Sequence, residues 1–368
     1  PLEKPAAVGR AMAQATHAMS SPGRGSYPAS RRAEETAYLC RQEAAELLGV
    51  PQPENVIITT SATHGLNIAI RSLLGSGDRV VISGYEHNAV TRPLAALGAR
   101  TTVAAGALFQ PEAVLEAFDK AVTPETDAVI CCHVSNVFGF VQPVEEIASL
   151  CRERGVPFII DASQSAGALT LDMDALGAAF IAMPGHKGLY GPQGTGVLLC
   201  SGEAPVRTLL EGGTGSQSMS QSMPDFLPDR LEAGTHNVPG IAGLLAGVRY
   251  VQQRGPENIL LRERRLAQLV SEGLRRLPGV TVYANGDLHS QAGVVSFTSR
   301  DLGAEEIAAA LGEKDIAVRA GLHCAPLAHE TVGTVDTGTV RVSFSDHNTP
   351  REVEGFLDAM EEILTQKP

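Results

Sequence analysis

Residues 183–188 read Met-Pro-Gly-His-Lys-Gly, a glycine-rich segment that carries a histidine and a lysine. An apolar run at residues 178–182 leads into it and is typical of a buried strand. A second apolar run, residues 156–160, ends in Asp161-Ala162-Ser163-Gln164. Because functional side chains gather where neighbouring strands of an α/β sheet end, Asp161 and Lys187 are expected to meet in one pocket.

An amine and a carboxylate that converge in this way are the pair that pyridoxal 5′-phosphate needs. The amine forms a Schiff base with the aldehyde, and the carboxylate keeps the ring nitrogen protonated. Taken singly, Lys187 reads as a surface lysine in a glycine-rich turn and Asp161 as a helix-capping residue. Together they favour a pyridoxal phosphate site.

Length and composition set the class of protein. A chain of 368 residues suggests two domains, and its net charge of −12 argues against nucleic acid or an anionic membrane as a partner. We find no apolar stretch long enough to span a bilayer. The six cysteines form no C-x-x-C pair and no zinc-binding set, so we expect no metal and free thiols in a reducing cytoplasm.

Strand and helix patterns alternate through the first two-thirds of the chain, which predicts an α/β fold with a mainly parallel sheet. The expected strands include residues 55–60, 79–82 and 128–132, and the expected helices 31–48, 63–74 and 143–154. Beyond residue 255 we expect helices at 257–277, 304–311 and 350–364, with strands at 280–283 and 294–297. This predicts a large domain at 1–250 and a smaller α+β domain at 251–368, with residues 212–228 as a long loop.

Other candidate residues also follow expected strands. Thr63 lies at a strand-to-helix turn where backbone amides can hold a phosphate, although an ordinary helix cap explains it equally well. His87 can stack on a cofactor ring and move protons, whereas a lone loop histidine is usually only solvated. Asn136 can donate to a ring hydroxyl.

Two residues near the C-terminus suggest substrate chemistry. Cys324 lies in a loop bounded by glycine and proline, where Arg319 and His323 can favour its thiolate. An incidental exposed cysteine fits the sequence equally well. Arg341, the one arginine in the expected strand 339–345, suits capture of a carboxylate, or else forms a surface salt bridge.

With these motifs in order, the chain resembles the cysteine desulfurases, a branch of the class-V aminotransferase-like enzymes of fold-type I. The resemblance covers nearly the whole chain. It implies a large domain with a mainly parallel seven-stranded sheet, a smaller C-terminal α+β domain, and active sites at a homodimer interface. It also implies conversion of L-cysteine to L-alanine with a persulfide on the enzyme, and a possible sulfur-acceptor protein as partner.

The resemblance also assigns cofactor contacts. Lys187 would form the Schiff base, Asp161 would pair with the ring nitrogen, and His87 would stack over the ring. Gln164 would contact the ring hydroxyl, and Asn136 the ring or the substrate. The residues implied at the phosphate are Ala62, Thr63, His186 and, reaching across from the partner subunit, Thr235.

For the substrate, Arg341 resembles the arginine that binds the α-carboxylate, and Cys324 resembles the nucleophile that attacks the sulfur. The chain departs from the family's pattern at Pro184, Gly188, His64 and His236. Three related activities therefore stay open, namely C–S lyase, selenocysteine lyase and class-V aminotransferase. A catalytically silent binding protein of this fold is the alternative outside enzymes, and the intact Lys187, Asp161 and His87 set weighs against it.

Overall fold

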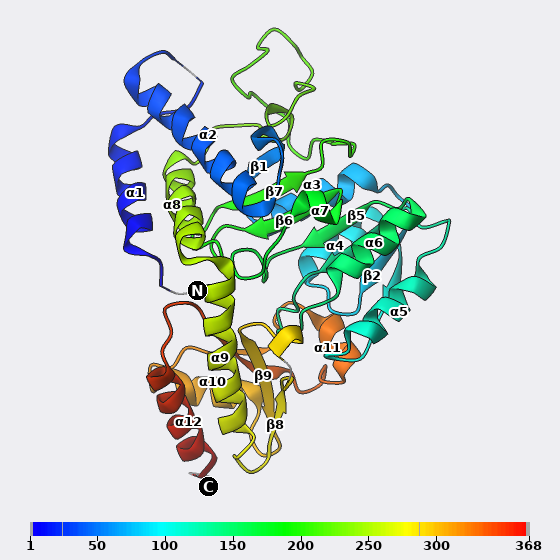
Figure 1. The fold of residues 1–368 in the computed structure, drawn as a ribbon, viewed down its shortest axis with the longest axis vertical. Coiled ribbons are helices and arrows are strands. Elements are labelled where there is room, and N and C mark those ends of the chain that lie inside the picture. Colours follow the sequence, from blue (N-terminus) through cyan, green and yellow to red (C-terminus); the bar gives the residue numbers. More distant parts are fainter. Residues whose placement is uncertain (1–2, 24, 287, 366–368) are drawn as a thin grey trace.

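The computed structural model describes residues 3–23, 25–286 and 288–365 and contains two sheets (Figure 1). The larger is a seven-stranded sheet in the order β1-β7-β6-β5-β4-β2-β3. Its strands are β1 (Val56–Thr59), β2 (Arg79–Ser83), β3 (Arg100–Ala104), β4 (Ala128–Cys132), β5 (Phe158–Asp161), β6 (Phe180–Pro184) and β7 (Gly196–Cys200).

Six of these strands run in one direction, and β7 runs against them. The pairs β2–β3, β2–β4, β4–β5 and β5–β6 are parallel, whereas β7 is antiparallel to both β1 and β6. Only a short loop joins β6 to β7, and a parallel pair needs a longer crossover, so the two strands pair as a hairpin. The predicted α/β fold with a mainly parallel seven-stranded sheet is confirmed.

Helices cover both faces of this sheet. The helices of this part of the chain are α1 (Ala6–Ala18), α2 (Pro28–Leu48), α3 (Ala62–Leu73), α4 (Asn88–Leu97), α5 (Pro111–Ala121), α6 (Val144–Arg154), α7 (Met173–Leu176) and α8 (Val238–Arg254). Side chains of β4 alternate between two cores, with Val129 packed among residues of α2, α5 and α6, and Ile130 among residues of α3 and α4. Because both faces of the sheet are buried, its strands are continuous apolar runs in the sequence.

The smaller sheet is antiparallel, in the order β10-β11-β9-β8. Its strands are β8 (Val280–Tyr283), β9 (Val294–Ser299), β10 (Arg319–Gly321) and β11 (Thr339–Ser343). The accompanying helices are α9 (Pro256–Leu274), α10 (Ala304–Gly312), α11 (Pro326–Val332) and α12 (Pro350–Thr365). Residues of α9, α10 and α12 form its own apolar core, which lies below the large sheet in Figure 1.

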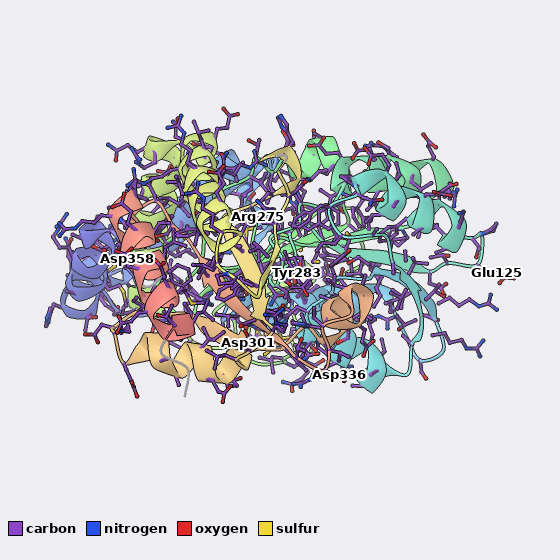
Figure 2. The ribbon with its side chains drawn as sticks, turned by 90° about the horizontal axis from the view of Figure 1, so that it is seen from below. Glu125, Arg275, Tyr283, Asp301, Asp336 and Asp358 are labelled. Atoms are coloured by element: carbon purple, nitrogen blue, oxygen red, sulfur yellow. The ribbon has the colours of Figure 1, made fainter. Side chains whose placement is uncertain are left out.

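Further features concern the surface and the connecting segments. Acidic side chains such as Glu125, Asp336 and Asp358 are exposed at the periphery (Figure 2). No helix among the described residues has the length and apolarity to cross a bilayer. Residues 212–228 contain neither helix nor strand, as expected. The predicted domain division after residue 250 stays a prediction and falls near the end of α8.

Candidate active site

Asp161 and Lys187 lie at the same edge of the large sheet. β5 ends at Asp161, which pairs in register with Ala182 of β6, and β6 ends shortly before Lys187. Asp161 is 3% exposed, and its Oδ1 accepts the Ser163 backbone N–H at 2.9 Å. Burial lowers the pKa of Lys187 from its ordinary value, and the nearby Asp161 carboxylate opposes this shift. The amine and the carboxylate therefore lie within electrostatic reach of each other at this edge.

His87 lies within electrostatic reach of this pair. It caps the N-terminus of α4, and its Nδ1 accepts the Ala89 backbone N–H at 2.9 Å, so the neutral ring carries its proton on Nε2. Burial lowers the pKa of His87; Asp161 opposes the shift and Lys187 reinforces it. A neutral imidazole therefore stands beside the amine and the carboxylate.

The N-terminus of α3 opens near His87. Ser61 Oγ accepts the His64 backbone N–H at 3.2 Å, and the helix begins at the buried Ala62. First-turn amides have no acceptor inside their own helix, so they suit a bound anion. Thr63 is exposed and lines a pocket of about 370 Å³ together with His87 and Cys324.

Cys324 reaches this pocket from the smaller domain. It is exposed, whereas the other five cysteines, all free, are buried. Cys324 and His323 have φ of 58° and 50°, a left-handed conformation that residues other than glycine rarely adopt. Two contacts hold this strained turn: Asn88 N–H donates to the Cys324 carbonyl and Asn136 Nδ2 donates to the His323 carbonyl, each at 2.8 Å.

The expectation that His323 favours the Cys324 thiolate is wrong. The His323 ring is buried, and burial together with the charge of Arg341 lowers the pKa of His323 to about 3. Its Nε2 lies 3.1 Å from the Thr339 carbonyl, which only an N–H can satisfy. The ring is therefore neutral near pH 7. Positive charge near Cys324 comes instead from Arg341, which interacts electrostatically with that thiol.

Arg341 occupies β11 directly opposite Arg319 of β10. Its Nη1 donates to the Asn136 carbonyl at 2.8 Å, and its buried Nε has no partner in the described structure. Burial and the neighbouring Arg319 lower the pKa of Arg341 to about 10, so the guanidinium stays charged at neutral pH. A half-buried guanidinium whose buried Nε–H is unused suits a carboxylate.

The structure shows fewer contacts for the remaining expected residues. Gln164 and His186 are half-buried beside Asp161 and Lys187 in sequence, and the His186 carbonyl accepts Lys4 Nζ at 2.5 Å. Thr235 is exposed in the segment before α8, and no hydrogen bond in the described part of the chain joins its side chain to the Lys187 group.

Sequence reasoning missed two features of this edge. Arg319 was expected to act on Cys324. Nothing in the sequence revealed that it lies opposite Arg341 on the neighbouring strand of the small sheet. Glu86 precedes His87 and is fully buried. The sequence does not show that this charged loop residue is buried. Its one signal is its position between an expected strand and the candidate His87.

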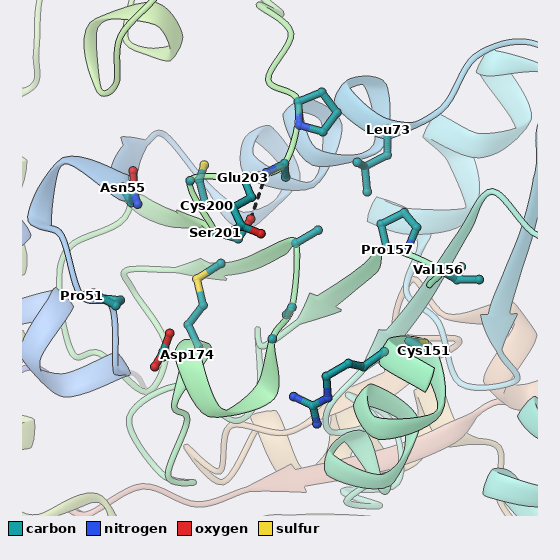
Figure 3. Close-up of a pocket in the computed structure, with 18 of the residues that line it drawn as sticks. Pro51, Asn55, Leu73, Cys151, Val156, Pro157, Asp174, Cys200, Ser201 and Glu203 are labelled. Carbon is teal, nitrogen blue, oxygen red and sulfur yellow. Dashed lines mark hydrogen bonds between the residues drawn. The ribbon is translucent and has the colours of Figure 1, made fainter. Parts of the chain in front are cut away.

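A larger cavity of about 920 Å³ lies at the opposite edge of the large sheet (Figure 3). Asn55, Val156 and Ala179, which line it, precede β1, β5 and β6, and Cys200 ends the reversed β7. None of the expected site residues lines it. In parallel sheets ligands bind where strands end, so we place the site at the Asp161 edge.

The residues at that edge fit pyridoxal phosphate. They provide a half-buried lysine of lowered pKa, a carboxylate within its electrostatic reach, a neutral imidazole, and a helix N-terminus for a phosphate. No cluster of three or more His, Cys, Asp or Glu side chains among the described residues suits a metal ion.

Comparisons with known proteins agree with this geometry. The model of the class-V aminotransferase family matches residues 1–356. The probable cysteine desulfurase of Pyrococcus abyssi is 32% identical over 357 residues, which cover 93% of this chain and 86% of that protein. The probable cysteine desulfurase of Mycolicibacterium paratuberculosis is also 32% identical, over 94% of this chain, but this chain spans only about half of its length, 52%.

Solved structures give the same result. An apo cysteine desulfurase from Thermococcus onnurineus NA1 matches with a TM-score of 0.87 and 31% identity, covering 98% of this chain and 92% of that one. The cysteine desulfurase CsdA from Escherichia coli matches with a TM-score of 0.86 and 26% identity, covering 98% and 92%. The chain therefore belongs to the class-V aminotransferase family, on the branch of the cysteine desulfurases.

Proposed function

We propose that this protein is a pyridoxal phosphate-dependent cysteine desulfurase that converts L-cysteine to L-alanine and leaves the sulfur as a persulfide on Cys324. The observation that carries the proposal is the position of Cys324. Alone among the six cysteines it is exposed, and it shares a pocket with His87 and Thr63. An exposed thiol beside His87, which lies within electrostatic reach of Lys187, suits sulfur transfer.

The chain's own residues would hold the cofactor. Lys187 would bind its aldehyde, Asp161 its ring nitrogen, and His87 would lie over its ring. Gln164 and Asn136 would approach the ring hydroxyl, while Ala62, Thr63 and His186 would surround the phosphate. When bound, pyridoxal phosphate supplies an electron sink for bond breaking at the substrate.

The substrate would be held and processed by three residues. Arg341 would bind the α-carboxylate through its Nε–H, because that buried donor has no hydrogen-bond partner among the described residues. Lys187 is suited to accept the Cα proton, because burial favours its neutral amine.

Cys324 would then attack the substrate sulfur. A new S–S bond forms, the substrate Cβ–S bond breaks, and a proton is added at Cβ. In total, cysteine and the Cys324 thiol become alanine and a Cys324 persulfide, with no external oxidant or reductant.

A homodimer would complete the site. Thr235 is exposed in the segment before α8 and would reach the phosphate bound by a second copy. Large apolar side chains are exposed in the preceding loop, at Leu210, Met219 and Phe226. Contact with a partner would cover them. Six free thiols support a reducing compartment such as the cytoplasm, where a protein acceptor would take the persulfide sulfur.

One product assay separates this proposal from its alternatives. The reconstituted protein is incubated with L-cysteine, and alanine and pyruvate are both measured. A desulfurase yields alanine in a 1:1 ratio to sulfur released to a reductant. A C–S lyase yields pyruvate instead, and an aminotransferase needs an added keto acid. Faster turnover of selenocysteine without need of Cys324 would indicate a selenocysteine lyase.

A further inference from the structure

Glu86 is a buried acid that the proposed reaction does not use. Its side chain is 0% exposed. One carboxyl oxygen, Oε1, accepts the Ser83 hydroxyl at 2.5 Å and the Cys132 backbone N–H at 2.7 Å. The other, Oε2, is buried without a hydrogen-bond partner in the described structure. A fully buried carboxyl with one unpaired oxygen calls for a physical reason.

The strand pairing of the large sheet explains the position of the Glu86 carboxyl beside β4. The parallel pairing of β2 with β4 ends at Ile82 and Ile130, because the chain then leaves β2 to form the loop that carries His87. Cys132, further along β4, therefore has no strand beside it on the β2 side. Glu86 Oε1 accepts its N–H and Gln142 Nε2 donates to its carbonyl, so two side chains replace the missing strand.

This replacement connects two parts of the candidate site. On its other side, Cys132 pairs in register with Asp161 of β5. Glu86 is also the residue immediately before His87. One carboxyl oxygen thus joins the loop that carries the imidazole to the strand that lies alongside the carboxylate.

The surroundings of Glu86 favour its neutral form. No cation of the described chain forms an ion pair with it, and the nearest charged group acting on it is Asp161, an anion. The Cys131 and Cys132 thiols of β4 interact electrostatically with it, and burial raises the pKa of each. Burial also raises the pKa of Tyr85, whose hydroxyl donates to the Gly106 carbonyl. Burial and Asp161 raise the pKa of Glu86 to about 8, against the opposing effect of its two hydrogen bonds.

A proton on Glu86 also accounts for the unpaired atoms. It would turn Oε2 from an acceptor into a donor. Gln142 Oε1, another buried oxygen without a partner in the described structure, is an acceptor in the same group of side chains around Ser83. A charged carboxylate here would instead be a second anion within electrostatic reach of Asp161.

We propose that Glu86 is a positioning residue that acts in its protonated form: it completes the edge of β4 at Cys132, fixes His87 relative to Asp161, and adds no second negative charge beside Asp161. The inference rests on the proposed function for its effect on turnover. Its effect on folding does not depend on any activity, which allows the two to be tested separately.

The first test uses the protein without cofactor. The melting temperature of wild type and of Glu86→Gln is measured from pH 5.5 to 9, with Glu153→Gln, an exposed position, as the control. Glutamine keeps the acceptor oxygen but cannot ionise. Because the unfolded chain releases this proton at a lower pH than the folded one, wild type loses stability as pH rises towards about 8.

The expected result is that Glu86→Gln gains stability over wild type as pH rises through this window, while Glu153→Gln keeps a constant difference from wild type. A difference for Glu86→Gln that does not change with pH overturns the assignment of the proton. This result is independent of whether the protein is a desulfurase.

The second test compares Glu86→Gln with Glu86→Ala after cofactor is added. The readouts are the visible circular dichroism of the bound cofactor, which reports how its ring is held, and kcat and KM for L-cysteine. We expect Gln to keep the wild-type signal and kcat within about threefold, and Ala to weaken the signal and lower kcat about tenfold or more, since only Ala leaves the Cys132 N–H unpaired. Equal loss in both variants, or no loss in either, overturns the positioning role.

Discussion

Arg341 Nη1 donates a hydrogen bond to the Asn136 carbonyl at 2.8 Å, and Asn136 Nδ2 donates in turn to the His323 carbonyl at the same distance. Asn136 lies on the loop after β4 of the large sheet, whereas Arg341 and His323 belong to the smaller domain. One asparagine therefore sets both the proposed carboxylate-binding residue and the turn that carries Cys324. The two domains are aligned at the site itself.

Arg341→Ala is expected to raise KM for L-cysteine by about ten- to a hundredfold, because hydrogen bonds to a charged group contribute about 1.5–3 kcal/mol each. Bound cofactor should stay near the wild-type amount. Arg341→Lys, which keeps the charge but loses the fork of N–H groups, should fall between the two. Parallel loss of cofactor and substrate affinity would show a role in domain alignment instead of substrate binding.

Lys187→Ala is expected to abolish turnover. Lys187 is the one lysine in residues 183–188, so the motif has no substitute amine. Burial lowers the pKa of Lys187, and Asp161 lies within electrostatic reach of it. The measurement is the visible absorption that appears when cofactor is added, together with alanine release. A variant that retains both the wild-type absorption and turnover would remove Lys187 from the reaction.

Asp161→Asn is expected to bind cofactor but to lose on the order of ten- to a hundredfold in kcat, because an amide cannot hold the ring nitrogen protonated. The Ser163 N–H that donates to Oδ1 can still donate to an amide oxygen, so the local fold should persist. Thermal unfolding of the variant checks this point. Unchanged kcat would show that Asp161 has only a structural role.

Much of the fold was predictable because the strands are short apolar runs between polar residues. The expected strand 128–132 coincides with β4, and the expected helix 31–48 ends at Leu48, with Gly49 as its left-handed cap. The reversal of β7 was not predictable from its composition, because direction depends on which strand it pairs with. Helix α4 escaped notice because Pro93 lies inside it and normally argues against a helix.

The candidate site shows the same limit. Asp161 and Lys187 could be expected together because each follows a strand of the same sheet. The neutral state of His323 could not be predicted, because it results from burial and from the charge of Arg341, a residue on a strand distant in sequence. Likewise, the approach of Cys324 to His87 depends on how the small domain docks, through the Asn88 and Asn136 hydrogen bonds.

His323→Gln is expected to make the protein less sensitive to acid. The folded protein holds His323 neutral, with a pKa of about 3, whereas the unfolded chain binds a proton near the ordinary histidine pKa of 6.5. Its contribution is present above pH 6.5 and is lost as pH falls below it. Between pH 7 and 5 wild type should lose up to about 2 kcal/mol that the variant keeps. Equal losses in urea unfolding at the two pH values would contradict this.

Cys324→Ala is the variant that separates a desulfurase from a lyase. Cys324 is exposed beside His87, and its loop is anchored by main-chain contacts that alanine preserves. The variant should therefore bind cofactor and change its visible absorption when L-cysteine is added, yet release almost no alanine. Cys324→Ser, with an oxygen of similar size but poor reactivity towards sulfur, should behave alike.

The buried cysteines provide the matched control for that experiment. Cys200→Ala removes a thiol that lies at the opposite edge of the sheet and should leave alanine release unchanged. A substrate whose sulfur or selenium departs without attack has no need of Cys324, so activity would then survive its removal. Pyruvate formed by Cys324→Ala at the wild-type rate would show that the site eliminates sulfur without a nucleophile. The enzyme would then be a C–S lyase built on the desulfurase fold.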